Sequence, residues 1–131
     1  MIKYTEEQLK NMKDMVLTHN HPKNCTFSPE DINFMVWNKL KQLDAVHRAE
    51  GGVVYTYTLK RIENVIPDVQ FAYDYKVAQD QLKVELDKQW QGSDKTQQLA
   101  DHLSSVLFNY SDVWLRNNAQ RYGYEYKAWK E

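Results

Sequence analysis

Apolar residues recur with the period of an α-helix over three stretches of the chain. The first covers about residues 29–43, where Ser28 and Pro29 form a favourable helix start. Apolar positions three to four residues apart share one face of a helix. In this stretch they are Ile32, Met35, Val36, Leu40 and Leu43. Trp37 falls off this stripe, so it could contact a second face or be an exposed aromatic, and a core or crevice position is the more common outcome.

Two longer stretches, about 68–90 and 95–121, predict a pair of helices. The apolar stripe of the first helix consists of Phe71, Tyr75, Ala78, Leu82, Leu86 and Trp90. That of the second consists of Leu99, Leu103, Val106, Leu107, Tyr110, Val113 and Trp114. Further apolar residues widen the first stripe, which predicts that this helix packs on two sides. These residues are Val69, Tyr73, Val77 and Val84. A glycine and polar residues at 91–94 favour a break, so the two helices should pair antiparallel.

Three other stretches, about 15–19, 44–50 and 53–59, predict β-strands. The last alternates, so that Tyr55, Tyr57 and Leu59 share one face. Gly51 and Gly52 predict a two-residue type I′ hairpin turn, because that turn needs a positive φ twice. A short helix over 5–14 and a closing strand over 124–126 complete the prediction. The fold class is therefore α+β, with a small antiparallel or mixed sheet, a helix after the first strand, and a C-terminal antiparallel helix pair.

Length and composition narrow the class of protein. A chain of 131 residues predicts one domain, with the sheet in 1–62 and the helix pair and tail in 63–131. The net charge of −1 gives no basic field for nucleic acid or an anionic membrane. No apolar run of about 18 residues predicts a membrane span, and no signal peptide opens the chain. The single cysteine, Cys25, excludes an internal disulfide and suits a reducing compartment.

One cluster of residue types suggests chemistry. If the strand at 15–19 continues through His21, alternation places His19 and His21 on one face, roughly 6–7 Å apart along the chain. Asp31, from the first turn of the next helix, could supply a carboxylate, and this set suits a catalytic Zn²⁺ with an open fourth position. The same residues also have a purely structural explanation. Ser28 can be an N-cap and Asp31 its capping-box partner, and the histidines can lie in a polar turn. Cys25 could be a thiolate ligand or a loop thiol without a role.

The order His19-x-His21 followed by Ser28-x-x-Asp31 resembles the JAMM (MPN) metalloprotease signature. More narrowly, it is similar to the JAMM-like C-terminal region of phage minor head (head morphogenesis) proteins. The resemblance implies that His19, His21 and Asp31 hold zinc and that Ser28 is a catalytic residue that stabilises the transition state. It also implies an upstream glutamate as general acid and base. Only 18 residues precede His19 here, so Glu6 and Glu7 are the upstream candidates.

Two functions follow as expectations. The first is a phage- or prophage-derived, non-catalytic interaction protein on a shortened JAMM-like fold, acting in capsid assembly or as an inhibitor of a host defence system of the anti-CRISPR type. A shortened sheet leaves an exposed edge, which would favour a protein partner or a homodimer. The alternative is a zinc-dependent amide or isopeptide hydrolase. Either protein would be cytoplasmic in the host cell or associated with the virion.

Overall fold

The computed structural model describes residues 13–21, 25–89 and 97–131. The helix expected over 5–14 lies outside these ranges apart from residues 13 and 14, which form a turn. The break expected at 91–94 also lies outside them. The described elements are β1 (Val16–Asn20), α2 (Pro29–Trp37), β2 (Gln42–Arg48), the 3₁₀ turn η1 (Glu50–Gly52), β3 (Val54–Arg61), α3 (Phe71–Gln89), α4 (Gln97–Asn118), the 3₁₀ turn η2 (Ala119–Tyr122) and β4 (Tyr124–Lys130).

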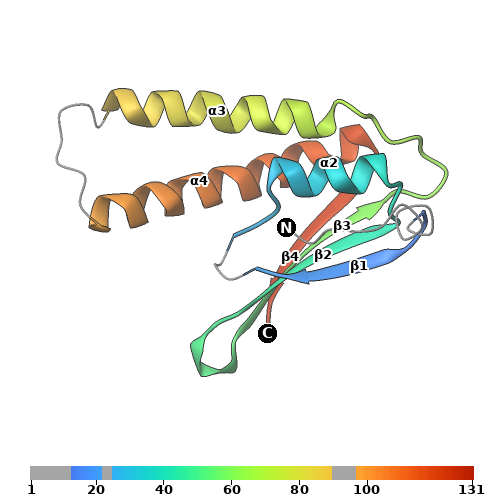
Figure 1. The fold of residues 1–131 in the computed structure, drawn as a ribbon, viewed down its shortest axis with the longest axis horizontal. Coiled ribbons are helices and arrows are strands. Elements are labelled where there is room, and N and C mark those ends of the chain that lie inside the picture. The colour runs from blue at the N-terminus through green and yellow to red at the C-terminus, as the bar shows by residue number, and fades with distance from the viewer. Residues whose placement is uncertain (1–12, 22–24, 90–96) are drawn as a thin grey trace.

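The sheet has four strands in the order β1-β2-β3-β4. β1 pairs with β2 in parallel, because the chain crosses over through α2 between them, and the other neighbours are antiparallel. Figure 1 shows the three helices lying over one side of the sheet, with α3 and α4 running in opposite directions. The predicted α+β class, the mixed sheet and the antiparallel helix pair are therefore confirmed. β4 is longer than the predicted closing strand at 124–126.

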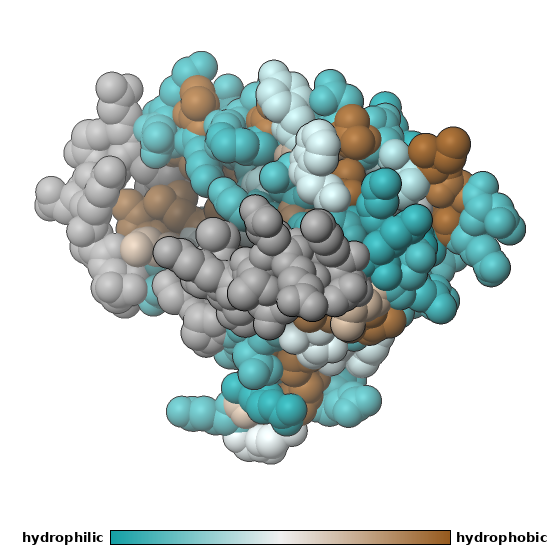
Figure 2. Space-filling model, turned by 45° about the vertical axis from the view of Figure 1, so that its right-hand side comes forward, coloured by the Kyte–Doolittle hydropathy of each residue, from teal (hydrophilic) through white to brown (hydrophobic). Residues whose placement is uncertain are grey.

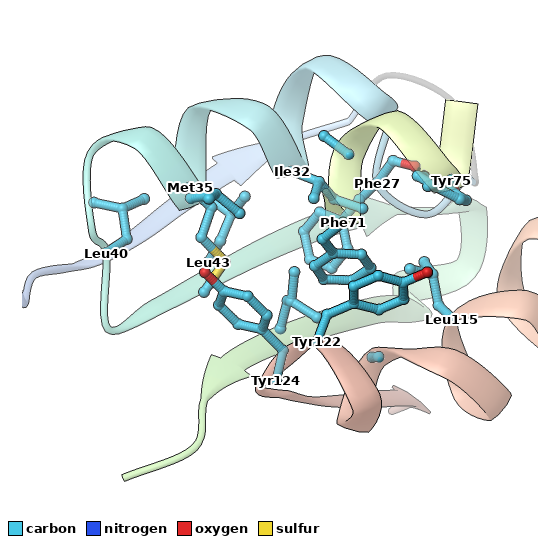
Figure 3. Packing of buried hydrophobic residues seen from close by; sticks show 14 of the residues in the cluster. Phe27, Ile32, Met35, Leu40, Leu43, Phe71, Tyr75, Leu115, Tyr122 and Tyr124 are labelled. Atoms are coloured by element: carbon cyan, nitrogen blue, oxygen red, sulfur yellow. Dashed lines mark hydrogen bonds between the residues drawn. The ribbon is translucent and has the colours of Figure 1, made fainter. Parts of the chain in front are cut away.

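Inward-facing strand residues line up across the sheet and pack against the helices. Leu43 of β2 lies opposite Leu59 of β3, and Leu59 lies opposite Tyr126 of β4. Two residues further along β2, Ala45 lies opposite Tyr57 of β3. These residues belong to one hydrophobic cluster with residues of all three helices, and Figure 3 shows part of it. The cluster joins residues from both the 1–62 and the 63–131 portions of the chain.

The first predicted helix is too long. α2 ends at Trp37, with Asn38 as its C-cap and Lys39 at a positive φ of 54°. Leu40 and Leu43 are fully buried, as the stripe predicted, but Leu40 lies in the turn after the helix and Leu43 lies in β2. The apolar spacing continues past the end of the helix because the chain turns back at Asn38 and Lys39 and the residues after the turn pack against the same core. Trp37 is 67% exposed, so it is the exposed aromatic of the alternatives and does not lie in the core or a crevice.

The predicted hairpin turn has one residue fewer than the real one. Ala49 N–H donates to the Val53 carbonyl at 2.8 Å, so the loop consists of three residues, Glu50–Gly52, in a 3₁₀ turn. Both glycines do have a positive φ, of 80° each. The second predicted strand correspondingly begins two residues earlier, at Gln42, and ends at Arg48.

The buried faces of the two long helices differ from the predicted ones: that of α3 is narrower and that of α4 is shifted. On α3, Tyr73 and Val84 are exposed, so this helix packs on one side and not on two. On α4, the buried positions are Ser111 and Leu115, whereas Val113 of the predicted stripe is exposed. Hydrophobicity alone does not rank the faces of such a helix, because exposed apolar residues are common on protein surfaces.

Gly123, which ends η2, has a left-handed φ of 93°. A Cβ at this position would lie 3.1 Å from the Pro67 Cα, whereas a Cβ on Gly52, also at positive φ, meets nothing within 4 Å. We expect Gly52→Ala to cost about 1–2 kcal/mol of the free energy of unfolding, which is the conformational cost of a left-handed non-glycine residue. Gly123→Ala should cost clearly more, because backbone must also move. Urea denaturation of both variants checks this, and equal losses would contradict the close packing against Pro67.

Candidate metal centre

His19 lies on the face of β1 that points towards the helices. Alternation along β1 places Leu17 and His19 inward, and His19 pairs in register with the small, buried Ala45. The His19 Nε2 atom is buried and has no hydrogen-bond partner among the described residues. Burial lowers the pKa of His19 below its usual 6.5, although the nearby Asp31 carboxylate opposes this effect. His19 is therefore a neutral imidazole with a free inward-facing nitrogen, which is the form in which histidine binds metals.

His21 is held in place on both sides. Its N–H donates to the Val46 carbonyl at 2.8 Å, which extends the parallel pairing past the end of β1. Its carbonyl lies 3.0 Å from the His47 Nδ1. On the ring, Nδ1 lies 3.1 Å from the Cys25 carbonyl oxygen, and Nε2 lies 3.5 Å from the Asp31 Oδ2. Metal-binding histidines usually donate their second ring N–H to a carbonyl or carboxylate, and Cys25 O is placed for that role.

Asp31 is oriented by the start of α2. The Ser28 Oγ accepts a hydrogen bond from Asp31 N–H at 3.1 Å, and Ser28 N–H donates to the Asp31 Oδ2 at 3.0 Å. This is the reciprocal capping box. The capping-box explanation of Ser28 and Asp31 is thus confirmed, and it coexists with the clustering of Asp31 and the histidines. His19 lies in β1 and not in a polar turn. The capping box fixes the Asp31 carboxylate, and His21 then lies within reach of it.

The three predicted ligands come together. His19, His21 and Asp31 each offer one ligand atom, and these atoms all lie within 4.8 Å of one another. The two imidazole rings meet edge to face, with centroids 4.6 Å apart. Two atoms bound to one tetrahedral Zn²⁺ at 2.0–2.1 Å are about 3.4 Å apart. The most distant ligand atoms would therefore have to approach each other by up to about 1.5 Å to bind one ion.

Ser28 and Cys25 lie beside this cluster without belonging to it. The Ser28 hydroxyl is engaged in the capping box, and its predicted catalytic role stays a prediction. The Cys25 Sγ lies 3.6 Å from the His21 Nδ1, on the far side of the ring from Asp31. Cys25 is not among the grouped ligand atoms, so the part of the chain that the structure describes gives no support to a thiolate ligand.

A groove of about 530 Å³ adjoins the cluster. Its walls are residues 25–30 and the facing sides of α3 and α4, with Tyr75, Leu107 and Phe108 among the apolar lining. Ser28 and Cys25 contribute to both the groove and the surroundings of the cluster. His19, His21 and Asp31 do not line the groove themselves.

Sequence reasoning identified the three candidate ligands but missed several groups around them. For His47 the sequence left two alternatives open, a group that supports a metal ligand and, in preference, a partly exposed strand histidine, and the structure places it against the His21 carbonyl. Two tyrosines, Tyr75 and Tyr126, form hydrogen bonds to the segment that joins His21 to Asp31. Alternation in the closing strand could have placed Tyr126 inward, but no signal in the sequence relates either tyrosine to residues 26 and 27.

The charges of the cluster predict a pH dependence for the metal-free protein. The carboxylate of Asp31, followed by Cys25, raises the pKa of His21 from 6.5 to about 10. Burial opposes ionisation of Asp31, but the hydrogen bonds from His21 and from Ser28 N–H outweigh it and lower the Asp31 pKa below 3.8. Because the folded pKa of His21 is above the unfolded one, the ion pair stabilises fully below pH 6.5. That contribution is lost as the pH rises towards 10.

Nuclear magnetic resonance (NMR) titration of the ring protons checks this expectation. The His21 ring should still be protonated at pH 8, while the His19 ring should be neutral. In Asp31→Asn, the His21 pKa should return towards 6.5, because the largest cause of its rise is removed. A wild-type His21 that titrates near 6.5 would contradict the observed pairing with Asp31.

Comparison of the chain with protein-family models, with curated proteins and with solved structures found no match. None of the helices in the described ranges is both long and apolar enough to cross a membrane. The arguments about function therefore rest on the site itself.

Proposed function

We propose that the chain is a JAMM-like domain that binds Zn²⁺ through His19, His21 and Asp31. The observation that carries the proposal is the convergence of these three ligand atoms to within 4.8 Å at the end of β1 and the start of α2. Its support from the sequence is the motif order H-x-H followed by S-x-x-D, which is similar to the JAMM signature.

The residues present fit the metal. Two imidazoles and one carboxylate are a common set of three protein ligands for a zinc ion that keeps a fourth position open. Zinc would have to displace the proton that makes His21 an imidazolium in the metal-free protein. The buried Nε2 of His19 has no partner among the described residues, and a metal would satisfy it. The Cys25 carbonyl fixes His21 from its second nitrogen, as expected for a ligand ring. When bound, zinc would polarise a substrate carbonyl and lower the pKa of water.

The chain's own groups determine whether metal binding leads to hydrolysis. General acid–base catalysis needs a positioned proton carrier and is typically worth about 10²–10⁴-fold in rate. Asp31 is the only carboxylate of the ligand group found in the described residues, and it is occupied by His21 and Ser28. The candidates Glu6 and Glu7 lie outside the described ranges. We therefore rank a non-catalytic binding role first and amide or isopeptide hydrolysis second.

Metal analysis tests the proposal directly. Wild-type protein dialysed against trace Zn²⁺ should retain about one zinc per chain, and His19→Ala should retain none. His102→Ala, which alters a histidine on α4 away from the site, is the matched control and should retain zinc. Equal zinc content in wild type and His19→Ala would contradict the proposal. Turnover of an isopeptide-linked substrate, abolished by chelator and by Glu6→Gln or Glu7→Gln, would reverse the ranking of the two roles.

A specific observation favours the interaction role. Among the described residues, seven large apolar residues are more than half exposed: Val16, Trp37, Ile66, Val69, Tyr73, Val84 and Val113. β1 pairs only with β2 in the described residues and is an edge of the sheet, and such edges favour pairing with another chain. Figure 2 shows hydrophobic residues interspersed with hydrophilic ones on the face in view. The resemblance to phage minor head proteins supports a partner in capsid assembly or in host defence.

Light scattering on a size-exclusion column tests the self-association part of this role. A homodimer through β1 should dissociate in Val16→Pro, because proline removes an edge N–H and Val16 is half-exposed. Trp37→Ser is the control that leaves the strand intact. A wild-type protein that is monomeric at all concentrations would assign the exposed residues to a different partner or to none.

A further inference from the structure

Residues 25–28, called the ligand segment below, lead into α2, which carries Asp31. The ligand segment includes Thr26 and Phe27, which are 5% and 1% exposed. Two tyrosines from distant parts of the sequence form hydrogen bonds to it. The Tyr75 hydroxyl of α3 donates to the Phe27 carbonyl at 2.6 Å, and the Tyr126 hydroxyl of β4 lies 2.8 Å from the Thr26 Oγ1. The second pair is separated by 100 positions in sequence.

Tyr126 is itself held by α4. Its hydroxyl lies 2.6 Å from the Asp112 Oδ1. A carboxylate can only accept, so Tyr126 donates to Asp112, and the Thr26 hydroxyl must therefore donate to the Tyr126 oxygen. The other Asp112 oxygen accepts from the Arg116 Nε at 2.9 Å, and the Arg116 guanidinium lies 5.8 Å from the centre of the Tyr126 ring. The result is a continuous chain of hydrogen bonds from Arg116 on α4 to the ligand segment.

We propose that Tyr126 and Tyr75 are positioning residues for the metal centre. This inference rests on the proposed zinc site and names residues on which that site depends. The ligand segment leads directly into Ser28 and α2, so the bonds at Thr26 and Phe27 hold the start of α2, and with it Asp31. Metal sites need their ligands held to within about 0.5 Å. The ligands all come from residues 19–31. Besides the bonds to Val46, Cys25 and Ser28 described above, the groups that hold the ligand segment come from α3 and β4, and α4 in turn holds β4.

If Tyr126 and Tyr75 only stabilised the fold, their replacement would affect zinc affinity differently. Buried tyrosine hydroxyls stabilise many folds, and their loss lowers stability without a special effect on a distant site. Tyr122 provides the matched control. Its hydroxyl donates to the Asp74 Oδ2 at 2.7 Å, so it is also a tyrosine–aspartate bond within the same core. That bond joins η2 to α3 and does not involve the ligand segment.

The experiment measures Zn²⁺ affinity by competition with a chromophoric chelator, at a temperature where circular dichroism shows every variant folded. Tyr126→Phe should weaken zinc binding by about 10–100-fold, the range for groups that support metal ligands. Tyr75→Phe and Thr26→Val should each weaken it in the same direction. Tyr122→Phe should bind zinc within about twofold of wild type, even where its melting temperature falls as far as that of Tyr126→Phe.

The outcomes distinguish failure of the positioning role from failure of the zinc site itself. Wild-type affinity in Tyr126→Phe, or equal weakening in Tyr126→Phe and Tyr122→Phe, would overturn the positioning role and leave the zinc site standing. A wild-type protein that binds no zinc would overturn the metal centre, and the positioning role with it. Loss of affinity confined to the variants that touch the ligand segment would support both.

Discussion

Zinc at about 1,000 times its Kd should raise the free energy of unfolding of the wild-type protein by about 4 kcal/mol, because a ligand that binds only the folded state stabilises it. His19→Leu should lose this effect entirely, since it removes one of three protein ligands. In the presence of a chelator, the same substitution should act in the opposite direction. The buried His19 Nε2 has no partner among the described residues, and such a group costs about 1–3 kcal/mol. Metal-free His19→Leu should therefore be more stable than the metal-free wild type.

Urea denaturation with and without Zn²⁺ measures both parts of this prediction. His102→Leu serves as a control for the loss of a histidine that can bind zinc weakly in the unfolded state. A zinc effect of equal size in wild type and His19→Leu would show that the metal binds elsewhere. A metal-free His19→Leu that is less stable than wild type would show that the imidazole contributes to packing more than its unpaired nitrogen costs.

Phe71→Ala should lower the free energy of unfolding by about 3–5 kcal/mol, the usual cost of removing a buried aromatic ring. Phe71 is fully buried at the start of α3 and stacks on Tyr122, with ring centroids 4.9 Å apart and planes 5° apart. It also contacts the rings of Trp114 and Tyr124. Figure 3 shows the Phe71 side chain beside Tyr122 within the core. Such a loss is a large share of the roughly 5–15 kcal/mol that stabilises a typical domain.

Tyr73→Ala is the matched control for this substitution. Tyr73 lies two residues further along α3 but is 62% exposed. Its truncation should change the free energy of unfolding by no more than about 0.5 kcal/mol, as for most surface positions. Urea denaturation of both variants gives the comparison. Losses of similar size would contradict the packing of α3 on one side and would support the two-sided packing predicted from its hydrophobic pattern.

The local geometry of the candidate site could be predicted from the sequence. Alternation along a strand places His19 and His21 on one face whatever the rest of the fold does, because side chains repeat every two residues. The capping box of Ser28 and Asp31 involves residues three positions apart, so its hydrogen bonds depend only on the start of a helix. The positive φ of Gly51 and Gly52 follows from the same kind of short-range constraint.

Contacts between distant segments could not be predicted in this way. The sequence placed Leu40 and Leu43 on a buried stripe, but only the turn at Asn38 and Lys39 moved Leu43 from a helix to a strand. The buried face of α4 shifted to Ser111 and Leu115 because packing, rather than hydrophobicity, selects which residues meet the sheet. The bond between Tyr126 and Thr26 has no local signal at all.

The sequence by itself therefore determined the types and order of the elements, the shared face of the two histidines and the capping of the helix that carries Asp31. Only the tertiary structure decided that His21 and Asp31 meet, because that contact requires the parallel crossover from β1 to β2. It also decided that α3, α4 and β4 hold the connecting segment. The physical reason is that short-range geometry is fixed by covalent structure and a few hydrogen bonds, whereas long-range contacts depend on how the whole core packs.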